Sequence, residues 1–251
     1  MGKEWIVRVL GPIDVMTPTG ASSAGGPQAR AVLGALAIGA GQAVPIDHLL
    51  HALWGDHPPE SAESTLQSYI SNLRHVLGAD AILRIDHAYA LGVGAQNIDA
   101  VRFESLLGRA IAEKADPGEC LRICREALHL WRGRPFGDLA DDEAFRLEAY
   151  RLGELRLAAM ELSMEAELAL GNHELVVCEL EVAVEEHPYR EHLWYLLIEA
   201  LAACDRRVEA LRACGRLRDV LAEVGVEAGD ALLSLEQQLL EGHGIPAAPR
   251  N

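Results

Sequence analysis

The chain has 251 residues, enough for two compact domains, and half of them are hydrophobic while only 5% are aromatic. This composition predicts a mainly helical protein with a core of Leu, Ala and Val. The formal net charge is −16, so the chain as a whole is repelled by phosphate backbones and acidic membrane surfaces. Any binding to nucleic acid must therefore depend on a local surface.

The sequence has no charged and then apolar leader and no apolar run of about 18 residues, so we expect no signal peptide, no membrane span and a cytoplasmic protein. Five cysteines, an odd number, form no CxxC pair and no Cys/His ligand spacing. Neither a disulfide framework nor a zinc module is predicted.

The first 98 residues predict a small sheet, three helices and a hairpin, in that order. WIVRVLGPIDVMTP alternates as short strands do, and GASSAGGPQ after it is typical of a loop. Helices are expected over residues 27–40, from residue 44, and over residues 61–77. The third helix has apolar residues spaced four, three and four apart: Leu66, Ile70, Leu73 and Leu77. Residues 81–93 predict two short strands around a turn at Asp86–His87.

Beyond Asp99 strand signals vanish and amphipathic helical patterns continue to residue 241. We expect a boundary at Asn97–Asp99, giving domains at 1–98 and 99–243, with a disordered tail at 244–251. Leu175 and Val208 lie 33 residues apart, and each opens a helix after a polar turn. This period is typical of paired helices of the tetratricopeptide type. Helices are expected at 101–113, 117–131, 142–170, 173–187, 191–203, 206–224 and 229–241.

Several strings resemble one family of proteins over almost the whole chain. They are VRVLGPIDV, GGPQARAVLGAL, LLHALWGDHPPESAESTLQSYISNLRHVLG, LHLWRGRPFGDL, ELALGNHEL and VLAEVGVEAGDALLSLEQQLL. The chain is thereby identified as a member of the SARP family, the antibiotic regulatory proteins of actinomycetes. The resemblance implies a fold that is mainly α, with an OmpR-type winged helix-turn-helix followed by an all-helical, tetratricopeptide-like bacterial transcriptional activation domain.

The family resemblance also implies a function. Members activate secondary-metabolite gene clusters by binding promoter direct repeats, with the third helix in the major groove and the wing near the minor groove. The implied partners are promoter DNA, RNA polymerase and a second copy of the chain in a homodimer, with no membrane. The implied DNA contacts are the third-helix residues Ser64, Thr65, Gln67, Ser68, Ser71 and Arg74, the wing residues Arg84, His87 and Tyr89, and Arg30 and His48 near phosphates.

The same comparison shows departures that weaken the basic face. Family members have Arg where this chain has Glu63, Asn72 and His75, and only Arg74 survives on the third helix. The usual T-R-P-P-G-Y of the wing becomes RIDHAY, which gains Asp86. Residues 1–98 hold five Lys or Arg against eight Asp or Glu. Either the remaining polar side chains still read a site within a multimer, or the domain no longer binds DNA.

Other functions remain open from the residues themselves. One is a regulator-derived protein that binds a partner protein or small molecule without DNA. Another is a pathway enzyme that uses His and Asp or Glu side chains in a cleft between the domains. Asp47, His48, His51 and His57 include an HxxH spacing that can hold a metal, although a solvated helix face is the preferred interpretation. No Gly-rich phosphate loop or catalytic motif appears, so no cofactor and no catalytic or metal-binding residue is predicted.

Overall fold

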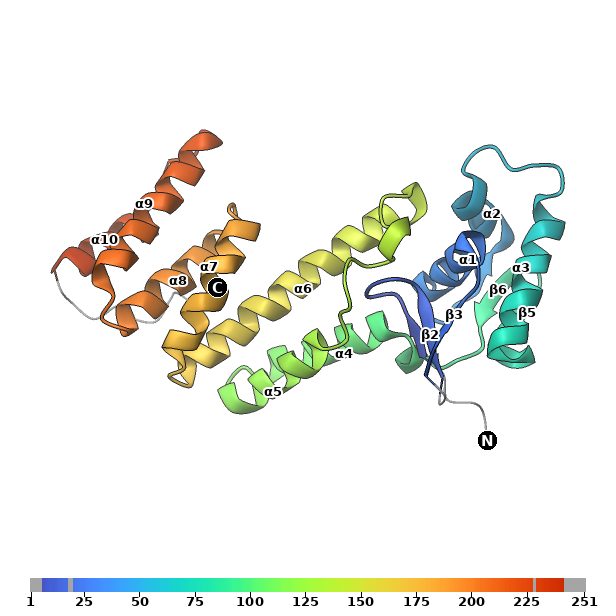
Figure 1. Ribbon diagram of the computed structural model, residues 1–251, viewed down its shortest axis with the longest axis horizontal. Coiled ribbons are helices and arrows are strands. Elements are labelled where there is room, and N and C mark those ends of the chain that lie inside the picture. The colour runs from blue at the N-terminus through green and yellow to red at the C-terminus, as the bar shows by residue number, and fades with distance from the viewer. Residues whose placement is uncertain (1–5, 18–19, 228, 242–251) are drawn as a thin grey trace. The chain divides into compact units, whose positions relative to one another are not determined.

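The computed structural model describes residues 6–17, 20–227 and 229–241 (Figure 1). The chain divides into two compact units. The first contains residues 1–109 and 123–159, and the second contains residues 110–122 and 160–251. The boundary expected at Asn97–Asp99 falls inside the first unit, and the tail expected at 244–251 lies outside the described residues. No helix among the described residues is long and apolar enough to span a membrane.

The chain begins with an antiparallel sheet of three strands in the order β1-β2-β3. They are β1 (Ile6–Arg8), β2 (Asp14–Thr17) and β3 (Gly20–Ser23). Val7 pairs with Val15 in the register, and both are fully buried, so one face of the sheet lies on the core. The prediction of a loop for GASSAGGPQ was wrong at its start. The segment Gly20–Ser23 pairs with β2 as an edge strand, where small polar residues are tolerated.

Three helices and a second sheet complete the winged helix-turn-helix. The helices are α1 (Pro27–Ile38), α2 (Ile46–Trp54) and α3 (Ala62–Leu77), and all three pack on one another. The sheet has the order β4-β6-β5, with β4 (Val44–Pro45), β5 (Ile82–Ile85) and β6 (Ala88–Leu91). The predicted hairpin is confirmed, and its turn places Asp86 at a φ of 50°. The sequence patterns missed β4, which is only two residues long.

The helical region begins with α4 (Asp99–Ala112), α5 (Pro117–Leu128) and α6 (Glu143–Ala169). Short 3-10 turns lie at Ala79–Ala81, Ala95–Asn97 and Gly137–Leu139. In the first unit the Phe103 and Trp131 rings meet edge to face, with centroids 5.2 Å apart. The Phe136 and Phe145 rings also lie 5.2 Å apart, and both are buried. These aromatic pairs fill the core between α4, α6 and the loop that joins α5 to α6.

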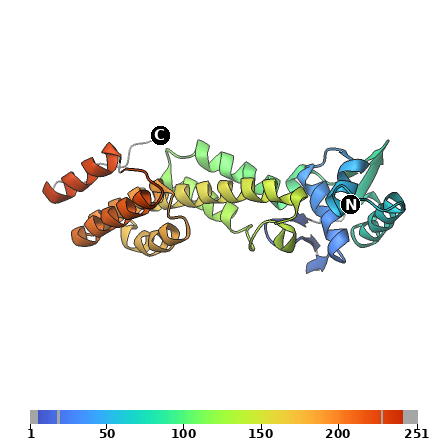
Figure 2. The ribbon, with the colours of Figure 1, turned by 90° about the horizontal axis from the view of Figure 1, so that it is seen from above.

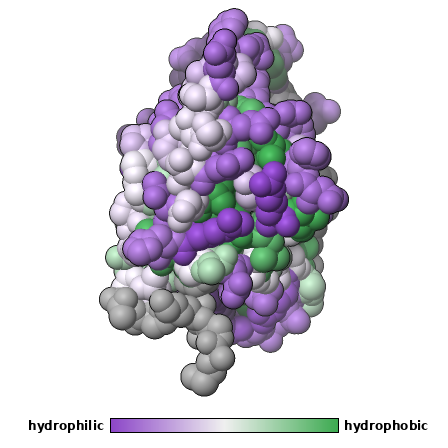
Figure 3. Space-filling model, turned by 90° about the vertical axis from the view of Figure 1, so that its right-hand side faces the viewer, coloured by the Kyte–Doolittle hydropathy of each residue, from purple (hydrophilic) through white to green (hydrophobic). Residues whose placement is uncertain are grey.

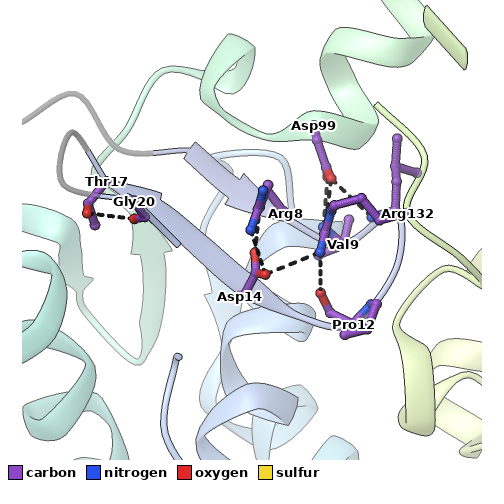
Figure 4. Close-up of polar contacts among 9 residues, drawn as sticks. Arg8, Val9, Pro12, Asp14, Thr17, Gly20, Asp99 and Arg132 are labelled. Carbon is purple, nitrogen blue, oxygen red and sulfur yellow. Dashed lines mark hydrogen bonds and ion pairs between the residues drawn. The ribbon is translucent and has the colours of Figure 1, made fainter. Parts of the chain in front are cut away.

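A polar junction joins the first sheet to the helical region within the first unit (Figure 4). Asp99, 2% exposed, accepts hydrogen bonds from the backbone N–H groups of Val9 (2.8 Å) and Leu10 (3.1 Å). Its carboxylate also lies 3.7 Å from Arg132 Nη2. Burial is the main cause that raises the pKa of Asp99 to about 6, against the opposing effect of these partners.

The loop after α5 continues the junction through its backbone. The N–H of Arg132 donates to the Leu10 carbonyl, and the N–H of Phe136 donates to the Val9 carbonyl, both at 2.8 Å. A Cβ at Gly11 would lie 2.9 Å from the Cβ of Arg132, so only glycine permits this close approach. Residues 9–11 and 132–136 therefore form one hydrogen-bonded structure.

The second unit contains α7 (His173–Glu186), α8 (Glu191–Ala203), α9 (Arg207–Glu223) and α10 (Asp230–Glu241). Here α7 packs on α8 and α8 packs on α9 (Figures 1 and 2). The starts of α7 and α9 lie 34 residues apart, close to the predicted helical period. The seven helices predicted after Asp99 are confirmed, with ends that differ by no more than three residues.

Charged groups connect the turns of the second unit. Glu165 on α6 lies 2.6 Å from Lys114 Nζ and 2.8 Å from His192 Nε2, and Glu161 lies 2.8 Å from Arg190 Nε. The Glu165 carboxylate is the main cause that raises the pKa of His192. Partial burial of Glu165 tends to raise the pKa of its carboxyl group, but His192 and Lys114 together lower it below its ordinary value.

Candidate nucleic-acid interface

The helix α3 has one buried face and one exposed polar face. Its buried residues are Ala62, Leu66, Ile70, Leu73 and Leu77, which pack toward α1 and α2. The opposite face presents Ser64, Ser68, Ser71 and His75, spaced four, three and four residues apart, and all four are exposed. The apolar period anticipated from the sequence thus fixes which side of α3 is free to contact a ligand.

The hydroxyl groups on α3 are partly used by the helix itself. Ser64 and Thr65 donate to the Ser61 carbonyl at 2.9 Å, and Ser68 donates to the Ser64 carbonyl at 3.0 Å. Their oxygen atoms keep lone pairs that can accept a hydrogen bond. Gln67 is exposed, and its amide has no intramolecular partner among the residues that the structure describes. Its amide can therefore donate and accept at once, as can that of Asn72, the other exposed amide of α3.

Arg74 has a structural partner inside the domain. Its Nε and Nη2 atoms donate to the Ile82 carbonyl at 2.9 and 2.8 Å. Ile82 is the first residue of β5, so the guanidinium group links the end of α3 to the wing. The family resemblance implied that Arg74 is one of the residues that read DNA. The structure instead gives its guanidinium group a position between the recognition helix and the wing.

The other arginines of the winged helix are also engaged. Arg30 Nη2 on α1 lies 2.6 Å from Asp138 Oδ2, and Arg8 forms a two-bond pair with Asp14. Arg84 lies 6.0 Å from the centre of the Tyr89 ring and donates weakly to the Asp86 carbonyl. Within residues 6–17 and 20–98 every arginine therefore has an intramolecular partner, and no lysine is present.

The predicted wing residues lie in different environments. Arg84 and His87 are exposed, and so is His48 on α2. Tyr89 is only 2% exposed, because it pairs with Val44 of β4 in the centre of the sheet. The Tyr89 side chain therefore belongs to the core of the winged helix and is not exposed for contact with DNA. The strand gave no alternating signal for this burial, because Ala88, Ala90 and Leu91 are also apolar and consecutive residues from Tyr89 to Leu91 are buried.

The surface around α3 is polar with scattered apolar side chains. Figure 3 looks at the side of the molecule on which α3 and β5 lie in Figure 1, and shows mostly hydrophilic surface interrupted by hydrophobic patches. The exposed large apolar residues of the winged helix are Ile38, Val76, Leu83 and Ile85, each 39–46% exposed. Glu63 and Asp86 are exposed carboxylates at the start of α3 and in the wing turn.

The histidines of α2 do not assemble a ligand set. His51 Nδ1 lies 3.6 Å from Asp56 Oδ1, and this is their closest charged contact. Across residues 6–17, 20–227 and 229–241, no group of three or more His, Cys, Asp or Glu side chains is placed to hold a metal ion. The HxxH spacing lies on an exposed helix face, since His48 and His51 are both exposed.

Comparison with known proteins identifies the two parts of the chain. Residues 98–240 match the model of the bacterial transcriptional activator domain, and residues 20–90 match that of the transcriptional regulatory protein, C terminal. The regulatory protein DnrI of Streptomyces peucetius is 35% identical over 236 residues, covering 88% of this chain and 86% of DnrI. The transcriptional regulatory protein EmbR of Mycobacterium tuberculosis is 34% identical over 248 residues.

A solved structure supports the same assignment. The structure of Mycobacterium tuberculosis EmbR in complex with a low affinity phosphopeptide aligns with a TM-score of 0.91 and 32% identity, covering 98% of this chain and 67% of that chain. In the sequence comparison the chain spans 64% of the length of EmbR. An OmpR-type winged helix followed by an activator domain, with this degree of identity to DnrI, establishes that the chain belongs to the SARP family of transcriptional regulators.

Proposed function

We propose that the chain activates transcription of a secondary-metabolite gene cluster by binding direct repeats in promoter DNA and contacting RNA polymerase. The observation that carries this proposal is the exposed polar face of α3, which no described residue covers. In this proposal α3 enters the major groove, and Arg84 and His87 of the wing approach the neighbouring minor groove. Two copies of the chain bind the two repeats.

Base reading in this proposal depends on neutral side chains. A glutamine amide pairs with the N6 and N7 atoms of adenine through two hydrogen bonds, and serine hydroxyl groups accept or donate to any base edge. Gln67 offers such an amide, with Ser64, Ser68 and Ser71 beside it. Arg74 supports this arrangement indirectly, because its bonds to the Ile82 carbonyl hold the end of α3 against β5.

Phosphate binding is expected to be weak for a protein of this class. Arg30 is half-buried and can reach a phosphate only by leaving Asp138, whereas Arg84 of the wing is exposed. Each neutralised phosphate contributes a slope of about −0.9 to the dependence of log K on log salt. Two phosphates per copy therefore predict a slope of about −2 per bound copy.

The experiment is a fluorescence anisotropy titration of the purified chain with labelled promoter fragments from its own gene cluster. Gln67→Ala should weaken binding to the preferred fragment about tenfold or more and leave the salt slope unchanged. Gln42→Ala is the control, because Gln42 is an exposed glutamine outside α3. A flat titration of the wild-type chain at low salt over every promoter of the cluster would remove the proposal.

Charge reversal at Glu63 tests whether α3 approaches the phosphate backbone. Glu63→Arg should tighten DNA binding and steepen the salt slope by about one unit, because it replaces a repelled group by one that neutralises a phosphate. Glu223→Arg at the end of α9 makes the same change in net charge away from α3. Equal effects of the two variants would show that only the overall charge matters and that α3 does not enter the groove.

The scarcity of free cations on the winged helix favours a second candidate function that does not involve DNA. Glu63 and Asp86 are exposed, while Arg8, Arg30 and Arg74 have intramolecular partners. A winged helix of this kind could serve as a module that binds a protein or small molecule without DNA. The variant with Gln67→Glu and Ser71→Glu adds two negative charges to the exposed face of α3 and should abolish binding to promoter DNA, so retained regulation of the pathway in this variant would favour the alternative.

A further inference from the structure

The helix α7 of the activator domain carries an apolar stripe on its outer face. Leu175 and Val182 are 55% and 58% exposed, and Cys178 between them is exposed as well. These residues are spaced three and four apart, so they follow one line along the helix. Tyr189, 59% exposed, follows Val182 by a further seven residues, just beyond the end of α7.

The stripe is separate from the residues that hold α7 in the fold. Packing within the unit uses the opposite side of the helix, through Val176, Val177, Leu180, Ala183 and Val184, all of them buried. A surface helix with one partner normally has a polar outer face. Apolar residues at positions i, i+3 and i+7 on that face are the pattern by which a helix contacts a second partner.

The charged residues of α7 itself all have the same sign, and Arg206, the cation with an electrostatic interaction with Cys178, forms an ion pair with Glu209 at 2.6 Å. The helix α7 contains five glutamates and no lysine or arginine: Glu174, Glu179, Glu181, Glu185 and Glu186. Glu181 and Glu185 pair with Arg216 of α9 at 2.8 and 2.6 Å. Glu174, Glu179 and Glu186 make no ion pair with any residue in the described part of the chain, and all three are exposed.

We propose that the outer face of α7 binds an α-helix of another protein whose apolar residues are flanked by Lys or Arg. The apolar side of such a helix covers Leu175, Cys178 and Val182, and its cations meet Glu179 and Glu186. Complementary charge selects this partner, since like charges brought together across an interface are strongly unfavourable. A second copy of α7 would place glutamate against glutamate in either direction, so the partner is not α7 of another copy of this chain. DNA is excluded from this face for the same reason.

The proposal goes beyond DNA binding and can be tested without it. Two synthetic helical peptides of about three heptads serve as probes, both with Leu at the apolar positions, one with Lys and the other with Glu at the flanking positions. Binding to the full chain is measured by calorimetry. The wild-type chain should bind the Lys-flanked peptide and not the Glu-flanked one.

The rate at which the Cys178 thiol is alkylated shows whether the peptide covers the stripe. In a Cys204→Ser background Cys178 is the exposed thiol of the described chain, because Cys120, Cys124 and Cys214 are buried. The Lys-flanked peptide should slow the reaction of Cys178 with an alkylating reagent. Val182→Asp should weaken peptide binding by roughly tenfold or more, whereas Val208→Asp, at a 63% exposed valine on α9, should not.

A charge exchange keeps the test independent of folding defects. The double variant Glu179→Lys and Glu186→Lys should lose the Lys-flanked peptide and gain the Glu-flanked one, which a misfolded protein would not do. Equal binding of both peptides by the wild-type chain, or binding of neither, would overturn the proposal. So would a self-association in sedimentation that Val182→Asp abolishes, because it would make the partner a second copy.

Discussion

The buried carboxylate of Asp99 should make the stability of the first unit depend on pH in an unusual direction. Burial raises the pKa of Asp99 from its ordinary value of 3.8 to about 6 in the folded chain. A carboxyl group with a raised folded pKa contributes stability below its unfolded pKa and loses that contribution as the pH rises through its folded pKa. A difference of about two pKa units corresponds to about 3 kcal/mol of unfolding free energy, lost between about pH 4 and about pH 7.

The variant Asp99→Asn isolates this effect, because an amide cannot titrate while other groups are common to both proteins. The charged neighbours that face Asp99 are Arg132 and, through Arg132, Asp14. Urea unfolding followed by circular dichroism gives the free energy of each protein across the pH range. The wild-type value should fall relative to the variant by about 3 kcal/mol as the pH rises.

The opposite outcome would refute the reasoning. Val9 and Leu10 donate N–H groups to the Asp99 carboxylate, and Arg132 lies near it. If these three partners outweighed burial, the folded pKa would lie below 3.8. The wild-type chain would then gain stability relative to Asp99→Asn as the pH rises, and desolvation would not be the dominant cause at this site.

Three further predictions concern packing and charge. Gly34→Ala in α1 should destabilise the chain by about 1 kcal/mol, because the new Cβ would lie 2.8 Å from Ile13 Cδ1 in the core and overpacking outweighs the gain in helix propensity. Gly153→Ala in α6 meets nothing within 4 Å and should stabilise by up to about 1 kcal/mol. A higher urea midpoint for Gly34→Ala would contradict the first prediction, and a lower one for Gly153→Ala the second. The ion pair of His192 with Glu165 raises the pKa of His192, so its contribution is full below about pH 6.5 and is lost as the pH rises through the folded pKa. His192→Ala should remove this loss from the profile of unfolding free energy against pH, and an unchanged profile would refute it.

The sequence was sufficient to predict the main elements because their signals are local. The apolar period of α3 placed its buried and exposed faces correctly, and the turn at Asp86 located the wing hairpin. The two short strands at Val44–Pro45 and Gly20–Ser23 were missed. Val44–Pro45 is only two residues long and pairs with β6, more than 40 residues later, whereas Gly20–Ser23 pairs with the neighbouring β2 but consists of Gly, Ala and Ser, which carry little strand signal.

The candidate interface was harder to predict because its arginine side chains bind partners that no local sequence pattern identifies. Arg30 pairs with Asp138, which lies 108 residues further along the chain, and no local pattern announces such a pair. Arg74 donates to the Ile82 carbonyl, and a sequence motif cannot indicate a backbone acceptor because every residue has one. The motif indicated which side chains occupy the expected DNA face. The structure then distinguished those that are free, such as Gln67, from those that are engaged.

The backbone bonds that join residues 9–11 to residues 132–136 affect how such regulators can be recombined. A chimera that exchanged only residues 1–98 would place the backbone of residues 9 and 10 from one parent against residue 99 and the 132–136 loop of the other parent. Exchange of DNA specificity between homologous regulators should therefore take residues 1–99 and residues 132–136 from the same parent. The segment that must be exchanged therefore includes residues beyond the winged helix.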